Sequence, residues 1–131
     1  MTLQAKIRRW LPAIFMMAII FAFSSTPSNE LPNFGLLDFL VKKTSHALGY
    51  AILSLCFLRA VRRGEKGSWY LLAFLLSVLY SVTDEFHQGF VSGRHPSPVD
   101  IGIDSFGAML ALIFSRLFRL KTQKRSIAPL P

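Results

Sequence analysis

The chain alternates between long apolar stretches and short polar segments. Four apolar stretches can be recognised, at about residues 10–24, 39–58, 69–83 and 101–118. Their apolar residues run continuously instead of alternating with polar ones, which is typical of membrane-spanning helices and not of barrel strands. Each stretch is slightly short against the roughly 20 residues that a helix needs to cross the hydrocarbon core, so flanking residues must help. Trp10, Trp69 and Tyr70 stand at the starts of stretches, where aromatic residues of the membrane interface are expected. The pattern therefore predicts an all-α bundle of four transmembrane helices.

The composition agrees with a membrane protein. The chain has 131 residues, of which 52% are hydrophobic and only 17% are charged. A soluble domain of this size has too much surface to cover with so few charges. The length allows a single domain, which we place at residues 1–131, with a cytoplasmic tail at residues 119–131. The single cysteine, Cys56, lies inside an apolar stretch and excludes an intrachain disulfide.

The basic residues indicate how the chain crosses the membrane. Twelve of the 15 lysines and arginines lie before the first apolar stretch, between the second and third, or from the end of the fourth (Arg116) onward. Only Lys42, Lys43 and Arg94 lie on the opposite side. Cytoplasmic loops carry an excess of basic residues, so both termini are predicted to be cytoplasmic. Because these residues form short clusters between apolar stretches, we expect no nucleic-acid binding, despite the net charge of +8.

The first apolar stretch allows a second interpretation. Basic residues, an apolar core and then Ala22, Phe23 and Ser24 also fit a secretory signal peptide. Pro12 near the entry and the apolar continuation toward Thr26 favour a membrane anchor. Cleavage would leave the positions of the other three helices unchanged.

The segment from Tyr80 to Gly107 holds most of the acidic side chains. It contains four of the seven carboxylates, two of the three histidines and Arg94, and it joins the third and fourth apolar stretches. Charges at the ends of membrane-spanning helices must be paired, hydrated or used in function. The predicted orientation places this segment at the outer side of the membrane, where we expect the functional site.

Helical spacing brings polar side chains from three helices to the same side. The acid–base candidates in the resulting pocket are His46, Asp84 and Glu85. Lys42 and Arg94 are suited to hold a phosphate oxygen, so the predicted ligand is anionic. The predicted ligand-binding residues are Lys42, Tyr50, His87, Gln88, Arg94, Asp100 and Asp104. On the fourth helix, Gly107 and Ala111 share one face with Asp100 and Asp104, and these small residues predict close helix contact.

Structural roles compete with these functional ones. Lys43 lies off the polar face and is expected to mark the membrane interface, with its charged end reaching water. An ion pair of Arg94 with Asp84 or Asp100 would only hold the loop in place. Ser97 or Asp100 is expected to cap the start of the fourth helix.

A metal site is a weaker alternative. Asp84 and His87 are three residues apart, the spacing with which a helix offers a carboxylate and an imidazole to one ion, and His46 and Asp104 would complete the ligands. No second motif of this kind is present, and the neighbouring lysines and arginine oppose a cation. We therefore expect neither a metal ion nor another cofactor.

Several of these elements together resemble a known family, the VanZ-like membrane proteins of bacteria, over about residues 12–118. The elements are the KKTSHALGY sequence of the second helix, the run from Asp84 to Gln88, Phe90, Gly93–Arg94, Asp100, and Asp104 with Gly107. The family often has asparagine at the position of Asp104, so this chain carries an additional carboxylate.

The resemblance implies a small multi-pass protein of the bacterial cytoplasmic membrane. The family is named for a member that raises resistance to a glycopeptide antibiotic of the teicoplanin kind, and no single mechanism is known across it. Glycopeptides bind cell-wall precursors on the outside of the membrane. These lipid-linked precursors lie in the same leaflet as the predicted pocket.

Two classes of function follow. The favoured one is a cell-envelope protein that binds or modifies an anionic, lipid-linked cell-wall component at the outer leaflet. Its expected partners are membrane lipids and this component, and its expected cellular effect is a contribution to glycopeptide tolerance. The sequence does not decide whether it is an enzyme, nor its oligomeric state. The alternative is transport of a small solute, with or without proton coupling, or a scaffold for another envelope protein.

Overall fold

The structure, a computed structural model, describes residues 2–27, 35–64 and 67–127. It consists of four α-helices: α1 (Leu3–Ser24), α2 (Leu36–Val61), α3 (Ser68–Gln88) and α4 (Pro98–Ile127). All four are long and apolar enough to cross a membrane. The predicted all-α fold with four membrane-spanning helices is confirmed, and the chain is a multi-pass membrane protein.

The helices extend beyond the apolar stretches. α1 begins at Leu3 and not near residue 10, because the Thr2 hydroxyl accepts a hydrogen bond from the Ala5 amide (3.4 Å) and caps the helix. α3 continues past Thr83 to Gln88, and α4 continues through residues 119–127, which the sequence interpretation assigns to a tail. Residues 128–131 lie outside the described part of the chain. Hydropathy marks what lipid can cover, whereas lysine, arginine and glutamine sustain a helix without adding hydropathy.

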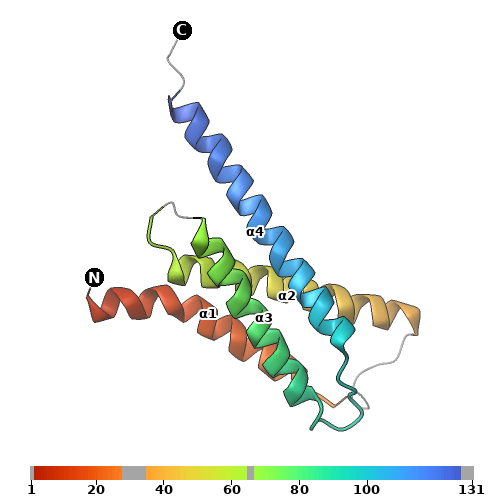
Figure 1. Ribbon diagram of the computed structural model, residues 1–131. Helices are drawn as coiled ribbons and strands as arrows, with labels where there is room; N and C mark the ends of the chain where they lie inside the picture. Colours follow the sequence, from red (N-terminus) through yellow and green to blue (C-terminus); the bar gives the residue numbers. More distant parts are fainter. Residues whose placement is uncertain (1, 28–34, 65–66, 128–131) are drawn as a thin grey trace.

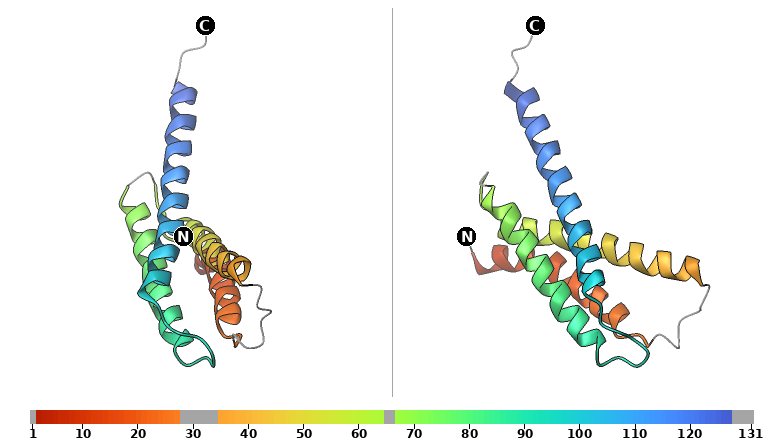
Figure 2. Two further views of the ribbon diagram at one scale, coloured as in Figure 1. Left: turned by 90° about the vertical axis from the view of Figure 1, so that its right-hand side faces the viewer. Right: turned by 45° about the vertical axis from the view of Figure 1, so that its right-hand side comes forward.

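The helix directions divide the bundle into two ends. α1 and α3 end where α2 and α4 begin (Figure 1). We call this the polar end, and we call the opposite one, where α1 and α3 begin and α2 ends, the basic end. The second half of α4 extends past the other helices (Figure 2), and none of its side chains at residues 113–123 is buried. Which end faces the cytoplasm stays a prediction from the loop charges.

The closest helix contact is between α2 and α4. A Cβ atom built on Gly107 would lie 2.2 Å from the Ala47 carbonyl oxygen, so only glycine fits there. Two turns farther along α2, the Ser54 hydroxyl lies 3.3 Å from the Ala108 carbonyl oxygen across the same interface. Small residues permit this approach, as the stripe on the fourth helix predicts. The contact fixes how the polar side chains of α2 and α4 face each other.

α1 packs into the bundle as an integral helix. Its Ala13, Ile20 and Ser24 are buried, and the Tyr80 hydroxyl of α3 donates to the Met17 carbonyl oxygen (2.6 Å). These contacts support the anchor interpretation of the first apolar stretch.

Candidate functional site

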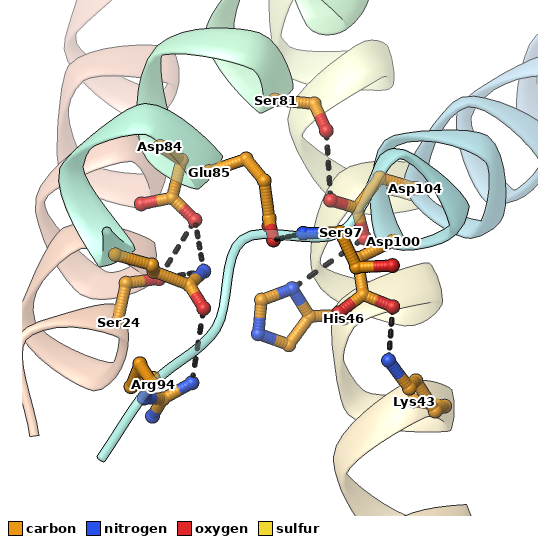
Figure 3. Close-up of polar contacts among 11 residues, drawn as sticks. Ser24, Lys43, His46, Ser81, Asp84, Glu85, Arg94, Ser97, Asp100 and Asp104 are labelled. Carbon is orange, nitrogen blue, oxygen red and sulfur yellow. Dashed lines mark hydrogen bonds and ion pairs between the residues drawn. The ribbon is translucent and has the colours of Figure 1, made fainter. Parts of the chain in front are cut away.

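Polar side chains from all four helices and the α3–α4 turn meet at the polar end (Figure 3). We call this group the polar cluster: Ser24, Lys43, His46, Ser81, Asp84, Glu85, Gln88, Arg94, Asp100 and Asp104. The helical stripes predict most of this convergence. Inside it, the contacts separate into two networks.

The first network is built around Asp84 of α3. One carboxylate oxygen, Oδ2, accepts hydrogen bonds from Ser24 Oγ (2.7 Å) and Gln88 Nε2 (3.1 Å). Gln88 Oε1 in turn accepts from Arg94 Nη1 (3.2 Å). Asp84 is only 3% exposed, and its second oxygen, Oδ1, has no hydrogen-bond partner among the described residues. Asp84 thus joins the ends of α1 and α3, and Gln88 links it to Arg94.

Arg94 completes the end of α1. Its Nε donates to the Thr26 carbonyl oxygen (3.2 Å) and its Nη2 to that of Phe23 (3.0 Å). The last carbonyls of a helix have no partner within the helix and carry a partial negative charge, which a guanidinium group satisfies. Among the described residues Arg94 therefore binds carbonyls and an amide oxygen. The alternative of an ion pair with Asp84 or Asp100 is not found among the described residues, because Gln88 lies between Arg94 and Asp84 and the turn directs the guanidinium toward α1.

Glu85 holds the start of α4. Its Oε1 accepts a hydrogen bond from the Ser97 amide (2.6 Å), and Ser97 Oγ accepts from the Val99 amide (3.3 Å). Ser97 is therefore the N-cap, as expected. A carboxylate beside the first amides of a helix is stabilised by the helix dipole, so Glu85 has a structural role.

Replacing Glu85 by alanine is expected to lower the free energy of unfolding by about 1–2 kcal/mol, because an amide at the start of α4 loses its acceptor. The Glu85→Gln variant keeps an acceptor oxygen and should lose less than half of that. Equilibrium unfolding in mixed micelles measures both values. Equal losses in the two variants would contradict the capping role.

The second network is built around Asp104 of α4. Ser81 Oγ donates to its Oδ2 (2.8 Å), and His46 Nδ1 lies 3.5 Å from its Oδ1. The latter distance permits an ion pair when His46 is protonated, although the two atoms lack hydrogen-bond geometry. Asp104 is 1% exposed. The additional carboxylate is thus buried between α2, α3 and α4 and faces the only histidine of α2.

Lys43 belongs to the polar cluster, contrary to expectation. Its Nζ forms an ion pair with Asp100 Oδ1. The start of α4 passes beside α2, so the Lys43 side chain reaches a carboxylate across the helix interface. Its expected position at the membrane interface stays a prediction.

Of two further predicted site residues, His87 lies toward α1 and Tyr50 lies in the buried core. The ring of His87 stacks on Phe21 with centroids 4.4 Å apart, and its Nε2 lies 3.0 Å from Ser25 Oγ. Each helical residue advances about 100°, so three residues place His87 some 60° from Asp84 and toward α1. Tyr50 is 1% exposed, and its hydroxyl has no hydrogen-bond partner in the part of the chain that the structure describes. Among the described residues no three metal-ligating side chains come together.

Two cavities open at the polar end. The polar cavity has a volume of about 370 Å³ and is lined by Lys42, Lys43, His46, Gln88, Gly93, Arg94, His95, Asp100, Ile103 and Asp104. The apolar cavity, of about 500 Å³, is lined by Met16, Ile19, Ile20, Phe23, Thr26, Val41, Lys42, Ser45, His46, Gly49, Tyr50 and Arg94.

The two cavities adjoin. Lys42, His46 and Arg94 line both of them. Among the described residues, no carboxylate lines the apolar cavity, whereas Asp100 and Asp104 line the polar one. Asp84, Glu85 and His87 line neither. Of the three predicted acid–base residues, only His46 therefore lies at a cavity surface.

Comparison with known proteins identifies the family. The profile of the VanZ/LLP1 family matches residues 9–119. The chain belongs to the VanZ/LLP1 family. The matched range contains the whole polar end of this VanZ/LLP1 protein, including both cavities. Neither curated proteins nor solved structures gave a match.

The sequence interpretation misses the serines of this VanZ/LLP1 site. Ser24 and Ser81 are buried and donate to Asp84 and Asp104. Ser81 lies one helical turn before Asp84 and Glu85, a spacing that gives a usable signal. Ser24 comes from the end of a different helix, and nothing in the local sequence connects it with Asp84.

Proposed function

We propose that this protein binds an anionic, lipid-linked cell-wall component at the outer leaflet of the bacterial cytoplasmic membrane. The observation that carries the proposal is the pair of adjoining cavities that share Lys42, His46 and Arg94. An amphiphile with a phosphate head and a hydrocarbon tail needs such a combination: cations at the junction, an apolar wall on one side and polar groups on the other.

The charges support an anionic head group. Lys42 and Arg94 bring positive charge to both cavities, and the ion pair between Lys43 and Asp100 balances its own charges. His46 is the group at the junction that can exchange a proton, and Asp104 Oδ1 faces it at 3.5 Å. The hydrocarbon tail is assigned to the space between α1 and α2, where Met16, Ile20 and Val41 form the wall.

The core of the bundle favours binding over passage of a solute. Beyond the polar end, the described core contains Leu53, Phe57 and Leu112. The buried hydroxyls of Ser54 and Ser77 donate to backbone carbonyl oxygens of their own helices. A pathway for ions or protons needs polar groups along its length.

Binding of farnesyl diphosphate to the full-length protein in detergent tests the proposal. The whole amphiphile should bind at least about tenfold more tightly than inorganic diphosphate or farnesol alone, because each fills only one cavity. The Lys42→Gln variant should bind about tenfold more weakly, since a charge-assisted hydrogen bond is lost. Native mass spectrometry or calorimetry gives the affinities.

Lys6→Gln is the matched control, because Lys6 is exposed and lies near the basic end. It should bind as the wild type does. Equal binding by the wild type and Lys42→Gln, or equal binding of the amphiphile and its two halves, would refute the assignment. The same variants, expressed in a susceptible bacterium, test whether the protein raises teicoplanin tolerance, which we expect to fall with Lys42→Gln.

A further inference from the structure

A third cavity lies at the basic end, on the opposite side of the bundle. Its volume is about 440 Å³, and four arginines line it: Arg9 of α1, Arg59 of α2, Arg62 directly after α2, and Arg119 of α4. Leu55 and Leu58 of α2 form its apolar wall. It shares no lining residue with the two cavities of the polar end.

The arginine cavity is strongly positive. Among the described residues no carboxylate lines it. Glu65 is the only acidic residue of the connection between α2 and α3. One carboxylate set against four arginines would still leave a net positive charge. Planar guanidinium groups match the geometry of phosphate oxygens and bind them with paired hydrogen bonds.

One arginine is held in position by α2. Arg9 Nε donates to the Arg59 carbonyl oxygen (3.1 Å), and its Nη2 donates to that of Arg62. This contact closes the end of α2 and fixes Arg9 beside Arg59. The arrangement therefore joins α1 and α2 before any ligand binds.

The apolar wall indicates what carries the phosphate. Leu55 is 40% exposed and Leu58 is buried, so the cavity continues onto a surface that lipid covers in a membrane. Loop charges predict that this end faces the cytoplasm, where anionic lipids concentrate and where basic pockets between helices bind their head groups. We propose that the arginine cavity binds a phosphate group, supplied by an anionic phospholipid of the leaflet at the basic end.

Tryptophan fluorescence of the full-length protein tests this proposal. Both tryptophans of the chain, Trp10 and Trp69, lie near the basic end: Trp10 follows Arg9, and Trp69 Nε1 donates to the Arg63 carbonyl oxygen (2.9 Å). In phosphatidylcholine nanodiscs, phosphatidylglycerol with brominated acyl chains should quench them saturably. Brominated phosphatidylcholine should quench only in proportion to its amount.

Two double variants with the same change in charge separate a site from general attraction. Arg59→Gln with Arg119→Gln should weaken phosphatidylglycerol binding at least about tenfold. Arg8→Gln with Arg63→Gln removes two exposed arginines outside the cavity and should stay within twofold of the wild type. Equal losses, or quenching without saturation, would overturn the site. Thermal unfolding in phosphatidylcholine checks that both variants remain folded. If the cavity variant unfolds, Arg59→Lys replaces it; lysine keeps the charge but cannot form the paired hydrogen bonds, so this variant should lose part of the binding, and unchanged binding would overturn the site.

Inorganic phosphate distinguishes the two sources of the ligand. At millimolar concentration it should compete only weakly with phosphatidylglycerol, because it lacks the chains that reach the apolar wall. Full competition, lost in the Arg59 and Arg119 double variant, would overturn the lipid assignment in favour of a soluble phosphate. Neither result depends on Lys42 or Arg94, so this test is independent of the function proposed for the polar end.

Discussion

Replacing Gly107 by alanine is expected to lower the free energy of unfolding by about 2–3 kcal/mol, the upper part of the range for an overpacked core. The added Cβ would lie 2.2 Å from the Ala47 carbonyl oxygen. A backbone atom cannot rotate away as a side chain can, so α2 and α4 must separate. Equilibrium unfolding in mixed micelles, followed by circular dichroism, measures the loss.

The site should change together with the fold. Ala47 follows His46 in the sequence, and Gly107 lies one helical turn after Asp104, so separating the helices lengthens the 3.5 Å distance between His46 and Asp104. Gly102→Ala on the same helix is the matched control, because a Cβ there meets nothing within 4 Å. It should be neutral or stabilising by up to about 1 kcal/mol, since alanine favours the helix. Similar losses in both variants would contradict the claim that Gly107 is needed for the close contact between α2 and α4.

Replacing Arg94 by alanine is expected to have the largest effect on ligand binding. We expect farnesyl diphosphate to bind about 100-fold more weakly, because Arg94 lines both cavities and also fixes Gln88. The free energy of unfolding should fall by about 2 kcal/mol, since the Phe23 and Thr26 carbonyls lose the hydrogen bonds that Arg94 donates. Binding and unfolding are measured on the same preparation.

Arg94→Lys separates the two roles. Lysine keeps the positive charge but cannot bind two carbonyls and an amide oxygen at once. It should therefore restore part of the binding and little of the stability. Unchanged binding in a destabilised Arg94→Ala variant would exclude Arg94 from the ligand site and leave its capping role intact.

The sequence predicts the helices well because lipid imposes one rule on long apolar stretches: their backbone groups must be satisfied within the segment. Helix ends are harder to predict. The first turns of α1 and the last turns of α4 are polar and still helical, since a single cap at Thr2 and good helix formers suffice. Hydropathy detects neither the cap at Thr2 nor the helix preference of polar residues.

The site is predicted in outline for a similar reason. Periodicity places Lys42, His46 and Asp104 on facing stripes, and the structure brings them to one cavity. Contacts between helices depend on crossing angle and register, which no local pattern encodes. For this reason the Lys43–Asp100 pair and the Ser24–Asp84 hydrogen bond are seen only in the structure.

The two arginine caps bear on the order in which the chain assembles. Arg9 closes the end of α2 from within the first pair of helices, whereas Arg94 closes the end of α1 from the turn between α3 and α4. The first helical hairpin, α1 and α2, can therefore form its Arg9 hydrogen bonds at the basic end as soon as it inserts. At the polar end it stays open until the second hairpin has crossed the membrane. The candidate ligand site thus forms last, and a chain interrupted before α3 should insert but have no site.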